Sequence, residues 1–283
     1  MKLIPIEGNS QKLDGGAMFG NAPKAMWEKW TAADSLNRIS LSCRCLLVVT
    51  DTGQNILFEA GVGVFFDKKM RDRFGVVEDN HCLIENLAVH GVSAQDIDDV
   101  VLSHLHFDHA GGLLTRYEDG PLQLAFPKAR FHVSRKNWER ALAPHPRDRA
   151  SFVPVLNQLL LESGRLVVVD DAPHESIAAL VHFHWSDGHT PGLMLSEIHT
   201  PAGPVVFTSD LIPGAAWVHV PISMGYDRFP ELVIDEKMKL LSELHKREAS
   251  LFFTHDPNTP CGKLQRDENG KFSTAAFDLA AIH

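Results

Sequence analysis

The sequence has few cysteines, no long apolar run and no cluster of basic residues, and each shortage argues against a class of protein. The four cysteines, Cys43, Cys45, Cys82 and Cys261, lack the spacing of a zinc finger or of a disulfide framework. We therefore expect Cys43 and Cys45 to serve as small buried residues. No stretch approaches the roughly 20 apolar residues of a membrane-spanning helix, so no membrane partner is expected.

The net charge and residues 1–8 argue against two further classes of protein, those that bind nucleic acid and those that are secreted. The formal net charge is −9, with the acidic residues spread along the chain. Binding to nucleic acid depends on clustered Lys and Arg, so no nucleic-acid partner is expected. Residues 1–8 contain no long apolar stretch and include an early acid, which argues against a secretory signal and favours a cytoplasmic protein.

Strands and helices alternate along the chain without a linker-like stretch, and 44% hydrophobic with 22% charged residues is an ordinary globular composition. The patterns predict strands at 39–50, 55–59, 99–103, 129–133, 166–170, 180–185, 193–198, 205–209 and 251–253. They predict helices at 84–90, 134–142, 152–163 and 230–245, and irregular segments at 8–30 and 211–229. The last helix is expected to bury Ile234, Met238, Leu241 and His245. We therefore expect one layered α/β domain over 1–283, made of two similar halves.

Four potential metal ligands follow the apolar run 100–102, which predicts a buried strand. They are His104, His106, Asp108 and His109, and two glycines after them allow a tight turn. Imidazole and carboxylate groups are ligands for zinc and also for iron, manganese or cobalt. A surface loop that is merely rich in histidine is the alternative, but three histidines and an aspartate within six residues argue against it.

Three further potential ligands also follow an apolar segment of the chain. They are His189, Asp210 and His255, and each follows a predicted strand. Any one of them alone could be a local cap at a strand end. In this order after the first cluster, they complete a set of seven candidate ligands.

With these seven residues in this order, the sequence resembles the metallo-β-lactamase superfamily. The string His-Leu-His-Phe-Asp-His-Ala-Gly-Gly, which begins at His104, is also similar to the N-acyl-homoserine lactonases. The resemblance implies an αββα sandwich with a dinuclear metal site at the edge where the two sheets meet. It implies two ligand groups and one bridging carboxylate: His104, His106 and His189; Asp108, His109 and His255; and Asp210 between them.

Two positions depart from the pattern of that family. Glu59 stands where the family usually has an aspartate, and it could still hold the ligand loop with a reach one methylene longer. Pro213 stands three residues after Asp210, where the homoserine lactonases typically carry a substrate-binding tyrosine. His219 and Tyr226 are candidates to replace that hydrogen-bond donor.

The ligand charges indicate hydrolysis. Two divalent ions bring four positive charges, of which Asp108, Asp210 and a bridging hydroxide remove three. The remaining charge is enough to polarise a carbonyl or phosphoryl oxygen, and metal binding lowers the pKa of water from about 15.7 to near 7. Asp108 is a candidate to orient the hydroxide and to carry its proton to the leaving alkoxide.

The loop 211–229 begins one residue after a candidate ligand and is rich in apolar side chains. These side chains either line a substrate pocket, which would suit an uncharged substrate with an apolar arm, or pack the loop onto the core. The apolar side chains of the loop are Trp217, Val220, Ile222 and Met224, and Met18 and Phe19 of the segment 8–30 are candidates to join them.

We therefore predict a metal-dependent hydrolase that uses a dinuclear site and a bridging hydroxide to open lactones or cleave uncharged esters. Two divalent metal ions are expected as cofactors, with zinc favoured, and a small molecule as substrate. Two alternatives stay open: a phosphotriesterase of the methyl-parathion-hydrolase type, and a metal-bound sensor without turnover. The oligomeric state also stays open, with a homodimer as one option.

Overall fold

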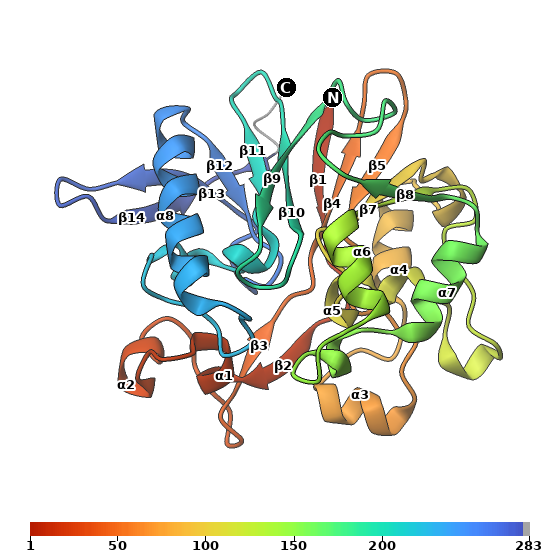
Figure 1. Cartoon of the computed structure of the whole chain (residues 1–283), viewed down its shortest axis with the longest axis horizontal. Coiled ribbons are helices and arrows are strands. Elements are labelled where there is room, and N and C mark those ends of the chain that lie inside the picture. The colour runs from red at the N-terminus through yellow and green to blue at the C-terminus, as the bar shows by residue number, and fades with distance from the viewer. Residues whose placement is uncertain (280–283) are drawn as a thin grey trace.

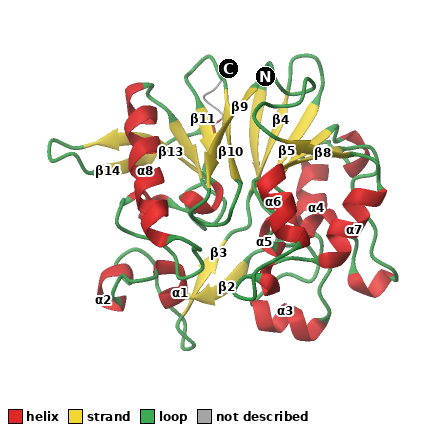
Figure 2. Cartoon of the chain, in the orientation of Figure 1, coloured by secondary structure: helices red, strands yellow, loops and turns green. Residues whose placement is uncertain are grey.

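Two six-stranded β-sheets pack face to face, with helices on their outer sides (Figure 1; Figure 2). This computed structural model of the chain describes residues 1–279. The first sheet contains, in spatial order, β1 (Lys2–Ile6), β4 (Cys45–Val49), β5 (Asn55–Phe58), β6 (Asp99–Val101), β7 (Arg130–Ser134) and β8 (Leu166–Val169). The second contains β14 (Phe272–Ala276), β13 (Cys261–Arg266), β12 (Ser250–Phe252), β11 (Val205–Phe207), β10 (Leu193–Ile198) and β9 (Val181–Ser186). The predicted αββα arrangement is confirmed.

The larger helices cover the outer face of one sheet or the other (Figure 1). Beside the first sheet lie α4 (Cys82–Val89), α6 (Arg135–Leu142) and α7 (Pro154–Glu162), and beside the second lies α8 (Pro230–Lys246). The other α-helices are α1 (Gly15–Phe19), α2 (Lys24–Trp27), α3 (Lys68–Phe74) and α5 (Phe107–Ala110). A small two-stranded sheet consists of β2 (Gln11–Asp14) and β3 (Arg38–Leu41). None of the helices within residues 1–279 has the length and apolar character needed to cross a bilayer.

Alternating side chains of the central strands join three layers of core. In β4, Leu46 and Val48 belong to the core between the sheets, whereas Cys45 and Leu47 belong to the core under the helices. Cys43 is also fully buried, as predicted for both of these cysteines. Full burial of a leucine or valine side chain stabilises a fold by about 1.5–3 kcal/mol relative to exposure. The core between the sheets therefore fixes how their edges meet.

The direction of the strands brings several carboxyl ends to one edge of each sheet. β6 pairs in parallel with β5, and β12 pairs in parallel with β11. β9 and β11 are both antiparallel to β10, so they run in the same direction. The predicted ligands follow β6, β9, β11 and β12, and therefore all leave their sheets at carboxyl ends.

Two predictions about the first 50 residues are wrong. The segment 39–50 is two strands, because the chain between them pairs with a loop of the second sheet: Arg44 N–H donates to Thr254 O at 2.9 Å. The segment 8–30 contains β2, α1 and α2 in place of an irregular loop. These elements are only four or five residues long and leave little periodicity to detect.

The buried face of α8 is also shifted by about one residue from the prediction. Leu241 is buried as predicted, but Met238 is 45% exposed. The other buried residues of α8 are Val233, Lys237, Leu240 and Leu244. The ammonium group of Lys237 donates hydrogen bonds to the backbone oxygens of Trp217 at 3.0 Å, His219 at 3.4 Å and Ile222.

Lys237 is thus an internal anchor for the loop 211–229. Burial lowers the pKa of Lys237 to about 7, and the charge of Asp227 offsets part of this effect. Three carbonyl acceptors match the three N–H groups of the protonated amine, which favours the charged form. The loop is therefore fixed to α8 through its backbone, whatever its side chains contact.

Replacing Lys237 by Met should destabilise the protein by about 2–4 kcal/mol. Each buried carbonyl left without a donor costs about 1–3 kcal/mol, and relief from burying the ammonium offsets part of the total. Urea unfolding of Lys237→Met measures the effect, with the exposed Lys239→Met on the same helix as control. Equal stability of the two variants would contradict the anchoring role.

Candidate metal centre

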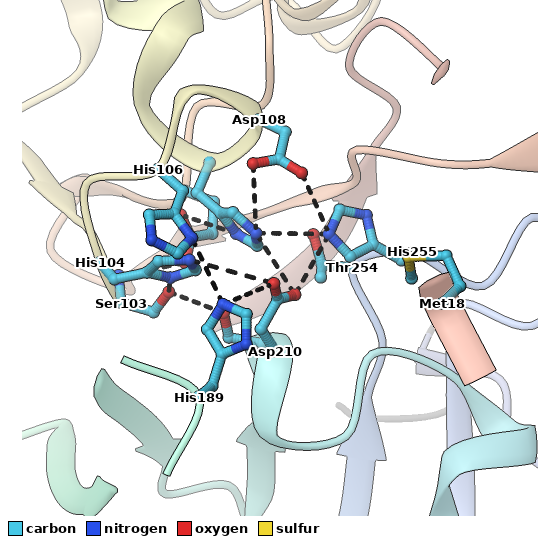
Figure 3. Close-up of polar contacts among 12 residues, drawn as sticks. Met18, Ser103, His104, His106, Asp108, His189, Asp210, Thr254 and His255 are labelled. Carbon is cyan, nitrogen blue, oxygen red and sulfur yellow. Dashed lines mark hydrogen bonds and ion pairs between the residues drawn. The ribbon is translucent and has the colours of Figure 1, made fainter. Parts of the chain in front are cut away.

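The seven candidate ligands converge on one point at the edge where the two sheets meet (Figure 3). His106 precedes the short helix α5, which carries Asp108 and His109. The other ligands come from the loops after β6, β9, β11 and β12. Six of the seven are buried, and Asp108 keeps 13% of its side chain exposed. The structure therefore brings the seven residues predicted from the sequence together, and Glu59 lies beside them with His104 and His109.

The first group of donors consists of His104, His106 and His189. His106 Nδ1 and His189 Nε2 lie 3.3 Å apart. Tetrahedral zinc binds nitrogen at about 2.0–2.1 Å, which places two such ligands about 3.3 Å from each other. His104 Nδ1 contacts Ser103 Oγ at 2.9 Å, and its Nε2 is buried with no hydrogen-bond partner. This orphaned nitrogen is what a cation at the group would satisfy.

The second group consists of Asp108, His109 and His255. The Nε2 atoms of His109 and His255 lie 3.3 Å apart, again the separation expected for two ligands of one ion. Asp108 Oδ1 is 3.9 Å from His109 Nε2, and Asp108 Oδ2 is 3.8 Å from His255 Nε2. These three residues could therefore hold one cation.

Asp210 lies between the two groups (Figure 3). Its Oδ2 is 3.2 Å from His189 Nε2, in the first group. Its Oδ1 is 3.3 Å from His109 Nε2 and 3.1 Å from His255 Nε2, in the second group. Each oxygen of one buried carboxylate thus faces a different set of nitrogen atoms, which is the arrangement that a bridging ligand requires.

Burial and neighbouring charges set the protonation of the histidines. Burial and the adjacent histidines lower the pKa of His104 and His106 well below the ordinary range, which favours the neutral form that binds metal. Burial also opposes charge on His109 and His255, but Asp210 outweighs it and raises the pKa of both well above the ordinary range. Positive charge is therefore required beside Asp210, and a cation can supply it in place of protons.

Outer contacts hold several of these ligands in place. Glu59 Oε1 accepts the Ser103 backbone N–H at 3.0 Å, and Glu59 Oε2 lies 3.6 Å from His109 Nδ1. Glu59 therefore holds the ligand loop, as the sequence suggested that it could. Its backbone has φ +68°, a left-handed conformation that is strained for a residue with a side chain.

Sequence reasoning missed Asp227, which lies in the loop 211–229. Its Oδ1 is 2.9 Å from His189 Nδ1, and its Oδ2 accepts the Met224 backbone N–H at 2.6 Å. Asp227 thereby directs Nε2 of His189 toward the other ligands. No strand precedes Asp227, so the signal that marked Asp210 was absent.

A cavity of about 240 Å³ lies beside the cluster, and Asp108, Asp210 and His255 contribute to its wall. Much of the remaining wall comes from separate segments of the chain and includes Leu13, Met18, Phe74, Phe107, Met224 and Tyr226. Of the two candidate donors, Tyr226 lines this cavity, and His219 is not among its lining residues.

The apolar side chains of the loop 211–229 and of the segment 8–30 divide between the two roles considered for them, lining a pocket and packing onto the core. Met18 and Met224 line the cavity, whereas Trp217, Val220 and Ile222 pack in the core under the second sheet with Phe19. The ring of Trp217 stacks on Phe19 with centroids 4.4 Å apart, and its Nε1 donates to Met18 O at 2.9 Å. Their apolar character therefore stabilises the loop and does not form the cavity wall.

Part of the chain is similar in sequence to curated lactonases. The N-acyl homoserine lactonase AiiA of Bacillus thuringiensis subsp. kurstaki is 30% identical over 173 residues, which are 59% of this chain and 58% of that protein. The chain thus spans less than two thirds of the curated lactonases that it matches.

Solved structures match over nearly the whole chain. A probable metal-dependent hydrolase from Staphylococcus aureus has a TM-score of 0.86 and 26% identity, covering 98% of this chain and 97% of its own. AidC, a dizinc quorum-quenching lactonase, has a TM-score of 0.75 and 22% identity, covering 98% and 94%. The model of the metallo-beta-lactamase superfamily matches residues 40–255, and the chain therefore belongs to that superfamily.

Proposed function

We propose that the protein is a hydrolase with a dinuclear metal centre that opens lactones or cleaves uncharged esters of small molecules. The observation that carries the proposal is the carboxylate of Asp210, whose two oxygens face two separate donor groups. We assign one zinc ion to His104, His106 and His189, the other to Asp108, His109 and His255, and Asp210 to both. The lactonases among its relatives support this reaction class.

The donor set fits such a centre because its nitrogen pairs have the separation of shared ligands and because His104 Nε2 is buried with no hydrogen-bond partner. When bound, two divalent ions supply a nucleophile by lowering the pKa of water, and they polarise the carbonyl oxygen under attack. Asp108 and Asp210 both line the cavity, and Asp108 is the more exposed of the two, at 13% against 7%. Asp108 is thus the carboxylate placed to take a proton and pass it to the leaving oxygen.

Tyr226 supplies the substrate hydrogen bond that Pro213 cannot donate. Its side chain lines the cavity and is 43% exposed, and partial desolvation raises the pKa of its hydroxyl, which stays protonated and able to donate. Met18, Phe107 and Met224 form an apolar surface near Asp108 that accommodates an uncharged substrate arm and excludes water.

Metal analysis gives the first test. We expect about two metal ions per chain in protein purified without chelators, with zinc predominant. Removing them with a chelator should abolish hydrolysis and lower the melting temperature, because the buried carboxylates lose their compensating charge and a bound ligand stabilises the folded state. Full activity in protein with only trace metal would contradict the proposal.

The bridging role of Asp210 can be tested by Asp210→Asn. Losing the charge shared by both groups should lower kcat by about two orders of magnitude or more, since metal-assisted charge stabilisation is worth several kcal/mol. Kinetics and metal content should be measured together, with the exposed Asp235→Asn on α8 as the control for the substitution itself. An equal effect in both variants would place the site elsewhere.

The substrate class follows from a panel of lactones, aryl esters and phosphotriesters. We expect turnover of carbonyl substrates, and a tenfold to hundredfold lower kcat/KM in Tyr226→Phe, because a lost hydrogen bond costs about 1–3 kcal/mol. Tyr117 is 50% exposed, so Tyr117→Phe is the matched control. Turnover of phosphotriesters alone would favour a phosphotriesterase, and tight metal binding without any turnover would favour a sensor.

A further inference from the structure

A buried glutamine reaches the metal cluster from the N-terminal part of the chain. Gln11 is fully buried, and its Nε2 donates a hydrogen bond to Asp108 Oδ2 at 2.8 Å. The amide must present its NH₂ group here, because its carbonyl oxygen would repel the carboxylate. Gln11 lies outside residues 40–255, the part of the chain that matches the superfamily model.

The backbone around Gln11 is fixed on two sides. In β2, Gln11 pairs with Leu41 of β3, and on its other side it forms an isolated bridge with Val76. Lys12 N–H also donates to Gly75 O at 2.8 Å. Side chains two residues apart on a strand point to the same face, and Leu13 lines the cavity. The strand therefore holds the amide of Gln11 toward the site.

Asp108 is the ligand that most needs such support. It is the most exposed of the three acidic side chains at the site, at 13% against 7% for Asp210 and 2% for Glu59. Its oxygens lie 3.8 Å and 3.9 Å from the nitrogens of His255 and His109, whereas Asp210 approaches the same two nitrogens to 3.1 Å and 3.3 Å. The bond from Gln11 restrains its rotation and keeps both oxygens directed at His109 and His255.

We infer that Gln11 is a positioning residue, which acts through Asp108 to set the affinity of the second ligand group for its metal ion. The inference rests on the dinuclear centre proposed above. It assigns to β2 a role in metal binding, in addition to its place in the cavity wall through Leu13. The first ligand group, of His104, His106 and His189, should not depend on it.

The test is a competition titration of the metal-free protein with Zn²⁺ and a chromophoric chelator. In Gln11→Met we expect one of two zinc equivalents to bind roughly 10–100-fold more weakly, the range found when an outer contact to a ligand is removed. The other equivalent should stay within about twofold. Gln54 provides a matched control, because its Nε2 donates to the buried Asp99 at 2.9 Å, away from the cluster.

A double-variant cycle separates positioning from a general loss of stability. In an Asp108→Asn background, adding Gln11→Met should weaken zinc binding no further, since the effect passes through the Asp108 carboxylate. Additive losses, equal weakening of both equivalents, or the same change in Gln54→Met would overturn the role. If the wild type takes up a single equivalent, the dinuclear centre is refuted. In that case a loss of affinity in Gln11→Met alone still supports the role, and unchanged affinity overturns it.

Discussion

The buried carboxylate of Asp210 is the constraint on which the site depends. A carboxylate removed from water is stable only where positive charge and hydrogen bonds replace its hydration. Nitrogen atoms of His189, His109 and His255 lie 3.1–3.3 Å from its oxygens. They come from loops after strands of both sheets, so the core between the sheets has to place those strand ends together before the charge can be balanced.

Groups outside the cluster set the orientation of several candidate ligands. Ser42 O contacts His255 Nδ1 at 2.7 Å, and Asp227 contacts His189 Nδ1, so both rings turn Nε2 toward the centre. Glu59 holds the ligand loop through the backbone of Ser103. These contacts explain how histidines from distant segments meet with nitrogen separations of 3.3 Å in the absence of any covalent link between the segments.

The local sequence pattern was enough to bring out the seven candidate ligands, because they follow apolar strands, and the carboxyl ends of strands that run in the same direction lie at one edge of a sheet. It was not enough for Lys237, Asp227 or Gln11, whose partners are backbone oxygens or side chains far away in the sequence. Gln11 and Asp108 are 97 residues apart, and no spacing rule links them. The buried face of α8 was predicted without Lys237, which this face includes. A lysine indicates a solvent-facing position unless the carbonyl groups that accept its hydrogen bonds are known.

The candidate metal centre and the cavity wall draw on different parts of the chain. Every candidate ligand falls within residues 40–255, the range that matches the superfamily, whereas Leu13 and Met18 in the cavity wall precede it. Met224 and Tyr226 come from a loop whose shape is held by Lys237 through backbone atoms, which leaves its side chains free to differ. On this basis the reaction class is set at the strand ends, and recognition of the substrate is set by segments attached to them. A proline at position 213 is then compatible with hydrolysis, because Tyr226 can donate the hydrogen bond from another part of the same loop.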